Sequence, residues 1–151
     1  MMQLKEGDFA PIFKAKNQHG ELVKLDSLKG QKVVLYFYPK DNTPGCTSEA
    51  CDLRDNYQKF IKQGYIILGV SPDSEKSHSN FISKYNLPFA LLADTEKEIA
   101  KAYGVWTEKK MYGKSYMGIL RTTFIISEEG KIEKIITKVD TKAHSIQIIN
   151  G

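Results

Sequence analysis

Two continuous apolar runs dominate the hydrophobic pattern of this chain, residues 33–38 and residues 65–70, and neither contains a charged side chain. An unbroken run of this length is typical of a strand covered on both faces, as the strands of parallel sheets are. Between the runs, apolar residues recur at helical spacing from about 44 to 63, and Gly64 follows as a stop signal. The pattern therefore predicts a strand–helix–strand unit with parallel strands.

Shorter patterns predict two hairpins and one further strand. The first hairpin lies near the start of the chain and the second in its last third, and each has a turn sequence rich in polar residues and glycine between its strands. The predicted strands are residues 13–16, 22–25, 89–92, 122–126 and 131–136.

Three more helices are predicted from capping signals and apolar spacing. Cap residues at 71–74 precede a helix with four side chains on one face, namely His78, Phe81, Ile82 and Tyr85. Thr95 and Glu98 predict a capping box for the next helix. The last predicted helix starts near Thr141 and meets residues 150–151.

The order of these segments predicts an α/β fold. Strands that alternate with helices give a central mixed sheet flanked by helices, to which the late hairpin adds antiparallel strands and the first hairpin an N-terminal β-hairpin. No internal repeat, low-complexity tract or linker interrupts residues 1–151, so we expect a single domain. The order of the strands does not follow from the pattern.

Composition narrows the class of protein. The 151 residues are 41% hydrophobic and 26% charged, as in an ordinary globular protein. The net charge of +4 is spread along the chain, so no nucleic-acid-binding face is expected. No stretch approaches about 18 uninterrupted apolar residues, and residues 1–8 lack the apolar run of a signal peptide. We therefore expect a cytoplasmic protein that does not bind a membrane.

The only two cysteines, Cys46 and Cys51, stand at the start of the predicted 44–63 helix, directly after the helix-start signal at residues 43–45. A thiol in the first turn of a helix faces unpaired backbone N–H groups and the positive end of the helix dipole. Both favour the thiolate, which is the reactive form of cysteine. A lone cysteine pair in the cytoplasm is more often catalytic or redox-sensing than structural. The pattern predicts a redox site in which the second thiol traps the oxidised first one.

Helical spacing gives the two thiols different surroundings. Cys46 falls on the apolar side of the predicted helix, whereas Cys51 lies toward the edge of that side and is expected to point outward. Five residues of helix separate two Cα atoms by about 8.7 Å, but a disulfide needs about 4.4–6.8 Å. Cys46 and Cys51 can therefore pair only if the first turns of the helix unwind.

Several interpretations of the neighbouring residues stay open at this point. Thr43 fits a helix cap and a hydroxyl ligand for a peroxide oxygen equally well, and a buried helical cysteine is also a common apolar filler. Pro39 ends the strand and has no N–H, so it can shield a pocket. No metal is expected, because Cys-x₄-Cys lacks a further Cys/His pair at zinc-like spacing, and no cofactor is expected, because the sequence contains no phosphate-cradling motif. His19, His78 and His144 are scattered, and we interpret them as surface or structural residues.

At the cysteines the sequence resembles a known family. The stretch Pro39-x-x-x-Thr43-x-x-Cys46 resembles the active-site motif of peroxiredoxins, and residues 36–51 resemble their peroxiredoxin Q branch, also called the bacterioferritin comigratory protein group. The resemblance runs nearly end to end, through separate blocks in the same order. These blocks are residues 69–74, 85–89, 103–106, 111–114 and 121–125.

The resemblance implies a thioredoxin-like fold and a thiol-dependent peroxidase that reduces hydrogen peroxide and organic hydroperoxides. Cys46 would be the peroxidatic cysteine and Cys51 the resolving one, and the two would form a redox disulfide. Thioredoxin or another dithiol reductant would reduce that disulfide. A monomer is expected, because the resolving thiol is in the same chain.

The resemblance also assigns supporting residues. Thr43 and Arg121 would complete the constellation around the sulfur, Pro39 would screen it, and Glu49 would orient the arginine. By itself, Arg121 is only a charge that opens an apolar strand. Beside a thiolate and a peroxide, as the resemblance implies, its positive charge would form strong, charge-assisted hydrogen bonds.

Two hypotheses from other classes remain. The chain could be a non-enzymatic redox sensor that passes its oxidised state to a partner protein, or a thioredoxin-like binding domain whose thiols are incidental. A peroxidase turns over many times with a thioredoxin system, a sensor oxidises stoichiometrically, and a binding domain does not react.

Overall fold

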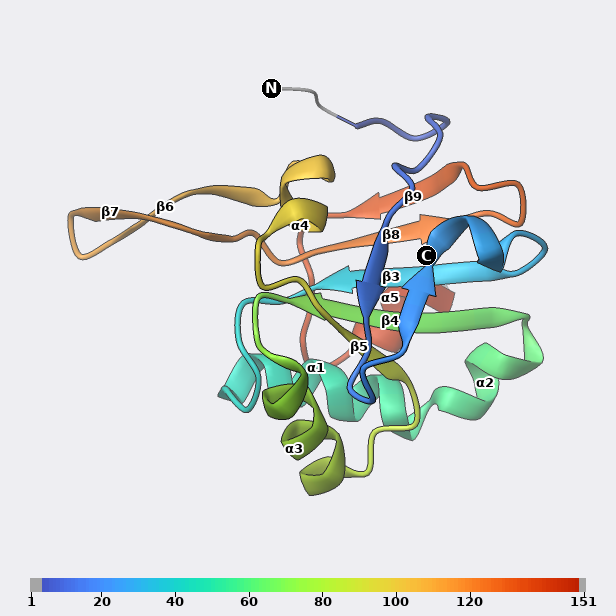
Figure 1. Ribbon diagram of the computed structural model, residues 1–151, viewed down its shortest axis with the longest axis horizontal. Helices are drawn as coiled ribbons and strands as arrows, with labels where there is room; N and C mark the ends of the chain where they lie inside the picture. Colours follow the sequence, from blue (N-terminus) through green and yellow to red (C-terminus); the bar gives the residue numbers. More distant parts are fainter. Residues whose placement is uncertain (1–3, 150–151) are drawn as a thin grey trace.

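A five-stranded mixed sheet forms the centre of the computed structural model, which describes residues 4–149 (Figure 1). In sequence order its strands are β3 (Lys32–Phe37), β4 (Tyr65–Ser71), β5 (Ala90–Ala93), β8 (Thr122–Ile126) and β9 (Ile132–Ile136). They lie side by side in the order β5-β4-β3-β8-β9. The pairs β3–β4 and β4–β5 are parallel, whereas β8 runs antiparallel to both β3 and β9.

The predicted strand–helix–strand unit is confirmed. β3 pairs with β4 in parallel, with Val34 opposite Ile67 and Tyr36 opposite Gly69. All residues of β3 after Lys32 are buried, because alternate side chains enter two separate apolar clusters on the two faces of the sheet. The unbroken apolar run therefore reflects a strand covered on both sides.

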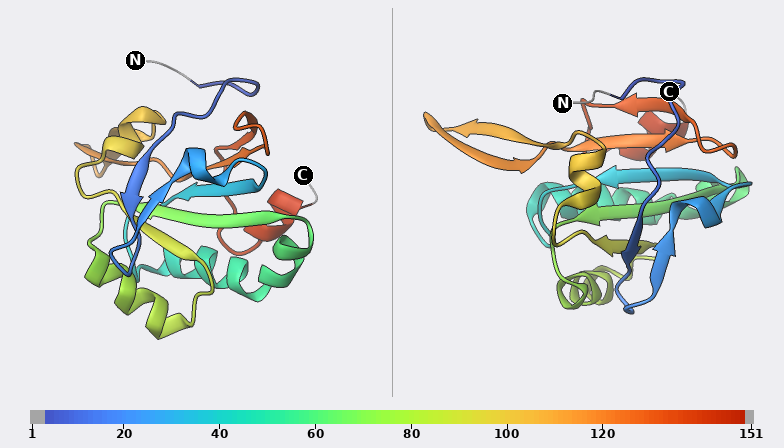
Figure 2. Two further views of the ribbon diagram at one scale, coloured as in Figure 1. Left: turned by 45° about the vertical axis from the view of Figure 1, so that its right-hand side comes forward. Right: turned by 45° about the horizontal axis from the view of Figure 1, so that its top comes forward.

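Helices and turns cover both faces. One face packs against α1 (Pro44–Asp55), α2 (Tyr57–Lys62), α3 (Glu75–Tyr85) and α5 (His144–Ile149). The other face packs against α4 (Glu98–Ala102) and the 3-10 turn η1 (Leu25–Leu28). Figure 2 shows α1, α2 and α3 gathered on one side of the strands. Within the described residues, no helix combines the length and the apolar character needed to cross a membrane.

Both predicted hairpins are present. β1 (Lys14–Lys16) pairs antiparallel with β2 (Leu22–Lys24) as a separate two-stranded sheet. β8 and β9 form the second hairpin, with a register shift between Ile125 and Ile126.

A third hairpin was not predicted. β6 (Trp106–Met111) and β7 (Lys114–Ile119) pair antiparallel and project from the body of the protein as an arm (Figure 1). Its turn places Tyr112 at φ 53° and Gly113 at φ 76°, the two positive values of a tight hairpin turn. Most side chains of β7 are exposed. The arm therefore lacks the buried apolar face on which the sequence prediction of a strand depends.

The predicted helix over 44–63 is wrong in one respect, because it is two helices. The break lies at Asn56, whose φ of −110° and ψ of 14° leave the helical region. Its side-chain Nδ2 donates to the Asp52 carbonyl at 2.9 Å, a local bond of the kind by which asparagine competes with helix continuation. Beyond the break the apolar stripe loses its register, and Ile61 is 44% exposed.

Two predicted helix starts also need correction, whereas a third is confirmed. Ser74 caps α3 by accepting from the Ser77 N–H. The capping box of Thr95 and Glu98 is absent, because the Asp94 carboxylate accepts from the first N–H groups of α4 instead. The last helix begins at His144 rather than near Thr141, and its predicted end at residues 150–151 lies outside the described residues.

Candidate active site

Residues 38–43 form the loop that joins the central strand β3 to the first turn of α1, and Cys46 is the third residue of that helix. Its side chain is almost fully buried, with 2% of the residue exposed. The first helical hydrogen bond runs from the Thr47 N–H to the Thr43 carbonyl at 2.8 Å. The N–H groups of Gly45 and Cys46 precede that bond, so they have no helical acceptor and are available to an anion.

Arg121 is the residue just before β8, and its side chain reaches the start of α1. Its Nη2 donates to Cys46 Sγ at 3.3 Å, and its Nη1 donates to Glu49 Oε1 at 2.6 Å. β8 lies directly beside β3, which brings together residues 75 positions apart in the chain. The structure therefore unites three of the predicted site residues, Cys46, Arg121 and Glu49.

The close approach of Arg121 depends on Gly45. A Cβ atom at position 45 would lie 3.2 Å from Arg121 Nη2, tighter than an ordinary van der Waals contact. A larger residue at this position would push the guanidinium away from the helix. The sequence Pro44-Gly45 thus starts the helix and leaves room for the cation.

The charges at the site are strongly coupled. Burial raises the pKa of Glu49 to about 7, although the neighbouring Arg121 guanidinium lowers it. Burial of the guanidinium lowers the pKa of Arg121, but Glu49 and Cys46 raise it by more, so the net pKa lies above its ordinary value. Arg121 therefore remains a cation beside the sulfur. The second oxygen of Glu49, Oε2, is buried and has no hydrogen-bond partner among residues 4–149.

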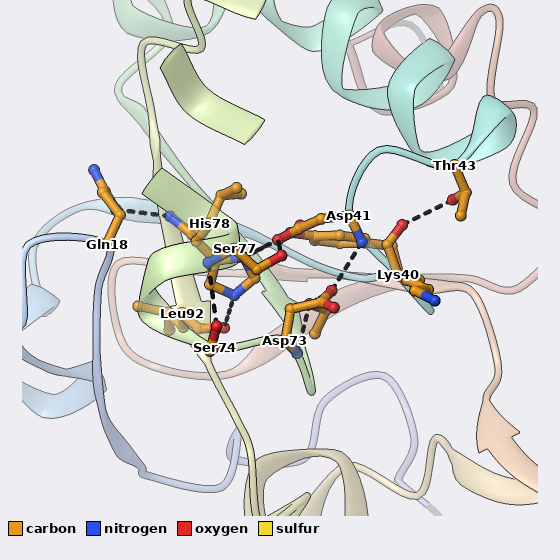
Figure 3. Close-up of polar contacts among 12 residues, drawn as sticks. Gln18, Lys40, Asp41, Thr43, Asp73, Ser74, Ser77, His78 and Leu92 are labelled. Carbon is orange, nitrogen blue, oxygen red and sulfur yellow. Dashed lines mark hydrogen bonds and ion pairs between the residues drawn. The ribbon is translucent and has the colours of Figure 1, made fainter. Parts of the chain in front are cut away.

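Thr43 and Pro39 lie in the loop between β3 and α1, and both are half-buried. Thr43 occupies the N-cap position, but its side chain makes no capping hydrogen bond. Instead, Thr43 Oγ1 donates to the Lys40 carbonyl at 2.7 Å (Figure 3). The predicted N-cap position of Thr43 is confirmed, but its hydroxyl caps no N–H group within the described residues, and the hydroxyl oxygen keeps its lone pairs for another donor.

Cys51 lies farther along α1 and is partly exposed, whereas Cys46 is buried. The predicted difference between an inward and an outward thiol is confirmed. Both sulfurs are free, and α1 is continuous over both positions.

Sequence reasoning missed a buried histidine next to Glu49. His144 Nε2 lies 3.5 Å from Glu49 Oε2 and 2.7 Å from Thr123 Oγ1. His144 Nδ1 donates to Gln147 Oε1, since the other end of that amide donates to the Lys138 carbonyl. Burial lowers the pKa of His144. No local pattern pointed to this contact, because α5 and α1 are far apart in the chain.

A second group missed from the sequence surrounds Asp41 in the β3–α1 loop. Ligand atoms of Asp41, Asp73 and His78 lie within 4.8 Å of one another, a spacing that could suit a metal ion. All three residues are hydrogen-bonded within the chain, however, as Figure 3 shows. His78 is completely buried, whereas His19 is exposed. We therefore interpret the group as a hydrogen-bond network that stabilises the loop, and we assign it no metal.

Comparisons with known proteins identify the family. The AhpC/TSA family model matches residues 7–135. Peroxiredoxin Bcp of Bacillus subtilis is 52% identical over 143 residues, which cover 95% of this chain and 91% of the relative.

Solved structures agree with this match. A PrxQ variant from Xylella fastidiosa has a TM-score of 0.92 at 32% identity, covering 99% of this chain and 96% of its own. The bacterioferritin comigratory protein of Xanthomonas campestris has a TM-score of 0.87 at 39% identity, covering 91% and 88%. The expected thioredoxin-like fold is therefore confirmed. The chain belongs to the AhpC/TSA family, in its peroxiredoxin Q or bacterioferritin comigratory protein branch.

Proposed function

We propose that Cys46 reduces hydrogen peroxide and organic hydroperoxides, and that Cys51 resolves the oxidised sulfur. The observation that carries the proposal is the 3.3 Å contact from Arg121 Nη2 to Cys46 Sγ at the start of α1. A cation and the positive end of a helix both stabilise a thiolate. Membership in the peroxiredoxins supports the same chemistry.

In the first step, the Cys46 thiolate attacks one oxygen of the hydroperoxide. The S–O bond forms as the O–O bond breaks, so the sulfur is oxidised to sulfenic acid and an alkoxide or hydroxide leaves and takes a proton from solvent. Arg121 and the free N–H groups of the helix start stabilise the charge that moves to the leaving oxygen. Thr43, whose own proton is donated to Lys40, accepts a hydrogen bond from the peroxide O–H.

In the second step, the Cys51 thiolate attacks the sulfenic sulfur. An S–S bond forms, the S–O bond breaks, and hydroxide leaves as water after protonation. Because an intact helix keeps the two Cα atoms about 8.7 Å apart, the first turns of α1 must unwind before this step.

An external dithiol then supplies two electrons by thiol–disulfide exchange and restores both thiols. Thioredoxin is the proposed reductant, by resemblance to the family. Organic hydroperoxides are included because the Xanthomonas campestris relative is described with alkyl peroxide reduction activity. We also propose a monomer, since both thiols belong to one chain.

Two substitutions test the roles of the cysteines. Cys46→Ser should abolish the fast reaction with peroxide, because the attacking sulfur is gone. Cys51→Ser should keep that first reaction but leave Cys46 as sulfenic acid, which mass spectrometry detects. Peroxide consumption with thioredoxin, thioredoxin reductase and NADPH should continue for many turnovers in the unaltered protein. Normal cycling of Cys51→Ser would refute the resolving role, and a single stoichiometric oxidation of the unaltered protein would indicate a sensor.

A further inference from the structure

The loop that carries Pro39 and Thr43 is held in place by one buried acid, Asp41. Its side chain is 3% exposed. Asp41 Oδ1 accepts from Tyr38 Oη at 2.6 Å, and Asp41 Oδ2 accepts from Ser77 Oγ at 2.7 Å. The backbone N–H of Asp41 donates to Asp73 Oδ2 at 2.8 Å. Asp41 thus ties the loop both to the end of β3 and to the start of α3.

Asp41 also binds His78, and the hydrogen bonds of His78 fix the number of protons between the two side chains. His78 Nε2 lies 2.9 Å from the Leu92 carbonyl, which can only accept, so Nε2 carries a proton. His78 Nδ1 lies 2.7 Å from Asp41 Oδ2. A lone pair facing a carboxylate at that distance would be repulsive, so one further proton lies between the two atoms. Figure 3 shows the ring of His78 between Asp41 and Leu92.

The pair is neutral as a unit whichever atom carries that proton. An imidazolium with a carboxylate and an imidazole with a carboxylic acid have the same net charge, and both give a short hydrogen bond. Tyr38 remains a phenol that donates, because burial raises its pKa well above the ordinary value. A neutral, fully hydrogen-bonded unit can stay buried, so the loop has a rigid anchor.

The same loop has a second tie to α3. Asn42 adopts a left-handed backbone with φ 60°, and its Oδ1 accepts from Lys84 Nζ and Tyr85 Oη at 3.2 Å each. These contacts are exposed, whereas the Asp41–His78 contact is buried. The buried contact therefore contributes most of the anchoring.

We propose that Asp41 and His78 are positioning residues that hold the Pro39–Thr43 loop and the start of α1 in the form that reacts with peroxide. The inference rests on the proposed function of Cys46. Within the described residues, the hydrogen bond to Cys46 Sγ comes from Arg121 and not from Asp41 or His78, so these two residues act through the loop that ends at Thr43. Since disulfide formation requires the first turns of α1 to unwind, the same anchor opposes the second step. Asp41 and His78 thus set the balance between oxidation of Cys46 and its pairing with Cys51.

The test uses the full chain in single-turnover reactions. Stopped-flow mixing with hydrogen peroxide measures the rate constant of Cys46 oxidation, and acid quenching with mass spectrometry measures the rate of Cys46–Cys51 disulfide formation. Asp41→Ala should slow oxidation by about tenfold or more, as expected for a displaced reacting group. It should leave disulfide formation equal or faster. Less Cys46 should then reach sulfinic acid at high peroxide concentration.

Asp41→Asn is the conservative control. Asn Oδ1 can accept from Tyr38, and Asn Nδ2 can donate to the unprotonated Nδ1 of a neutral His78. This variant keeps the anchor without its negative charge, and both rates should stay within about threefold of the unaltered protein, a difference near 0.7 kcal/mol.

Position 78 offers a matched pair. In His78→Asn the side-chain Nδ2 occupies nearly the place of the imidazole Nδ1 and can still bind Asp41, but the bond to Leu92 is lost. In His78→Gln the longer amide reaches toward the Leu92 carbonyl and the bond to Asp41 is lost. Oxidation should be slower in His78→Gln than in His78→Asn, because only His78→Gln loses the bond to Asp41 that holds the loop.

A distant core variant separates positioning from general destabilisation. Ile132→Ala opens a cavity in β9 on the other face of the sheet, so it lowers the melting temperature without touching the loop. Its ratio of oxidation rate to disulfide rate should equal that of the unaltered protein. An unchanged ratio in Asp41→Ala would overturn the inference. If the unaltered protein itself fails to react rapidly with peroxide, the proposed function is wrong, which is a different result.

Discussion

The buried carboxyl of Glu49 combines two demands that oppose each other. Its Oε1 holds Arg121 beside Cys46, which requires a negative charge. Its Oε2 has no hydrogen-bond partner in the described part of the chain and lies 3.5 Å from His144 Nε2. That nitrogen accepts from Thr123, because its partner Nδ1 is the donor to Gln147. Ionised Glu49 therefore orients the cation at a cost in folding free energy.

This cost makes folding stability depend on pH. Burial raises the pKa of Glu49 from 4.5 to about 7 in the folded protein. A raised folded pKa means that the stabilising effect of the protonated acid is present below pH 4.5 and is lost as pH rises through 7. Glu49→Gln removes this loss, because glutamine does not ionise. Between pH 5 and pH 9, the unfolding free energy of the unaltered protein should therefore fall by about 3 kcal/mol more than that of Glu49→Gln.

Urea unfolding of both proteins at the two pH values measures this difference. Parallel stability curves would contradict the prediction, since they would mean that Glu49 ionises equally easily in the folded and unfolded chains.

Gly45 should separate stability from reactivity. Gly45→Ala places a Cβ 3.2 Å from Arg121 Nη2 and displaces the guanidinium from Cys46 Sγ. Alanine also favours the helix over glycine, which contributes up to about 1 kcal/mol of stability. We expect an equal or higher melting temperature together with about tenfold slower oxidation of Cys46 by peroxide. A variant that is less stable but equally reactive would show that Arg121 tolerates the extra methyl group.

Side chains of the neighbouring strands β3 and β5 pack closely over Gly69 of β4. Gly69 on β4 lies opposite Tyr36 on β3. The ring of Tyr36 and the side chain of Leu91 fill the space that a Cβ at position 69 would need, at 2.8 Å from Cζ and 2.6 Å from Cδ2. Tyr36 stacks in turn on Tyr38, which holds the loop acid Asp41.

Gly69→Ala should therefore destabilise the protein by about 1–3 kcal/mol through overpacking of this sheet face. Thermal unfolding gives the size of the effect. Gly130→Ala serves as a comparison, because its added Cβ would meet nothing closer than 3.9 Å and its cost comes from a positive φ of 87° alone. If Gly69→Ala is neutral, Tyr36 and Leu91 have room to shift and the close contact is not a constraint.

Strands and helices could be predicted where their buried side chains form a continuous or periodic apolar pattern in the sequence. β3 and β4 were found because their side chains are covered on both faces. The β6–β7 arm was not found, because the exposed side chains of β7 follow no apolar pattern. The break at Asn56 was missed for another reason: one polar side chain bonded to a backbone carbonyl outweighs a continuous helical spacing.

The position of α1, which packs on the sheet next to α5, suits a local rather than a global rearrangement. The Asp52 carboxylate accepts from the Ser145 N–H at 2.7 Å, which ties the second half of α1 to α5. The first turn lacks this tie; Arg121 contacts it at Cys46, and the loop at Asp41 precedes it in the chain. Unwinding can therefore begin at the start of α1 while the five-stranded sheet keeps its hydrogen bonds.

Hydrogen exchange tests this division across the molecule. After oxidation by one equivalent of peroxide, amides of residues 45–51 should exchange faster, because the disulfide cannot form on an intact helix. Amides of β3 and β4 should keep their protection. Unchanged protection of residues 45–51 in a protein whose Cys46–Cys51 disulfide is verified by mass spectrometry would contradict the prediction.

Local chemistry in the chain was sufficient for the fold class, the two parallel central strands and the difference between a buried Cys46 and a partly exposed Cys51, because each depends on the spacing of nearby residues. The same holds for the family, whose motif lies in one continuous stretch. The resemblance to the family implied that Arg121 and Glu49 lie near Cys46. The contact of Glu49 with His144 and the anchor of Asp41 on His78 required the folded structure. Strand order and helix docking bring those side chains together, and residues distant in the chain leave no mark of their proximity in a single sequence.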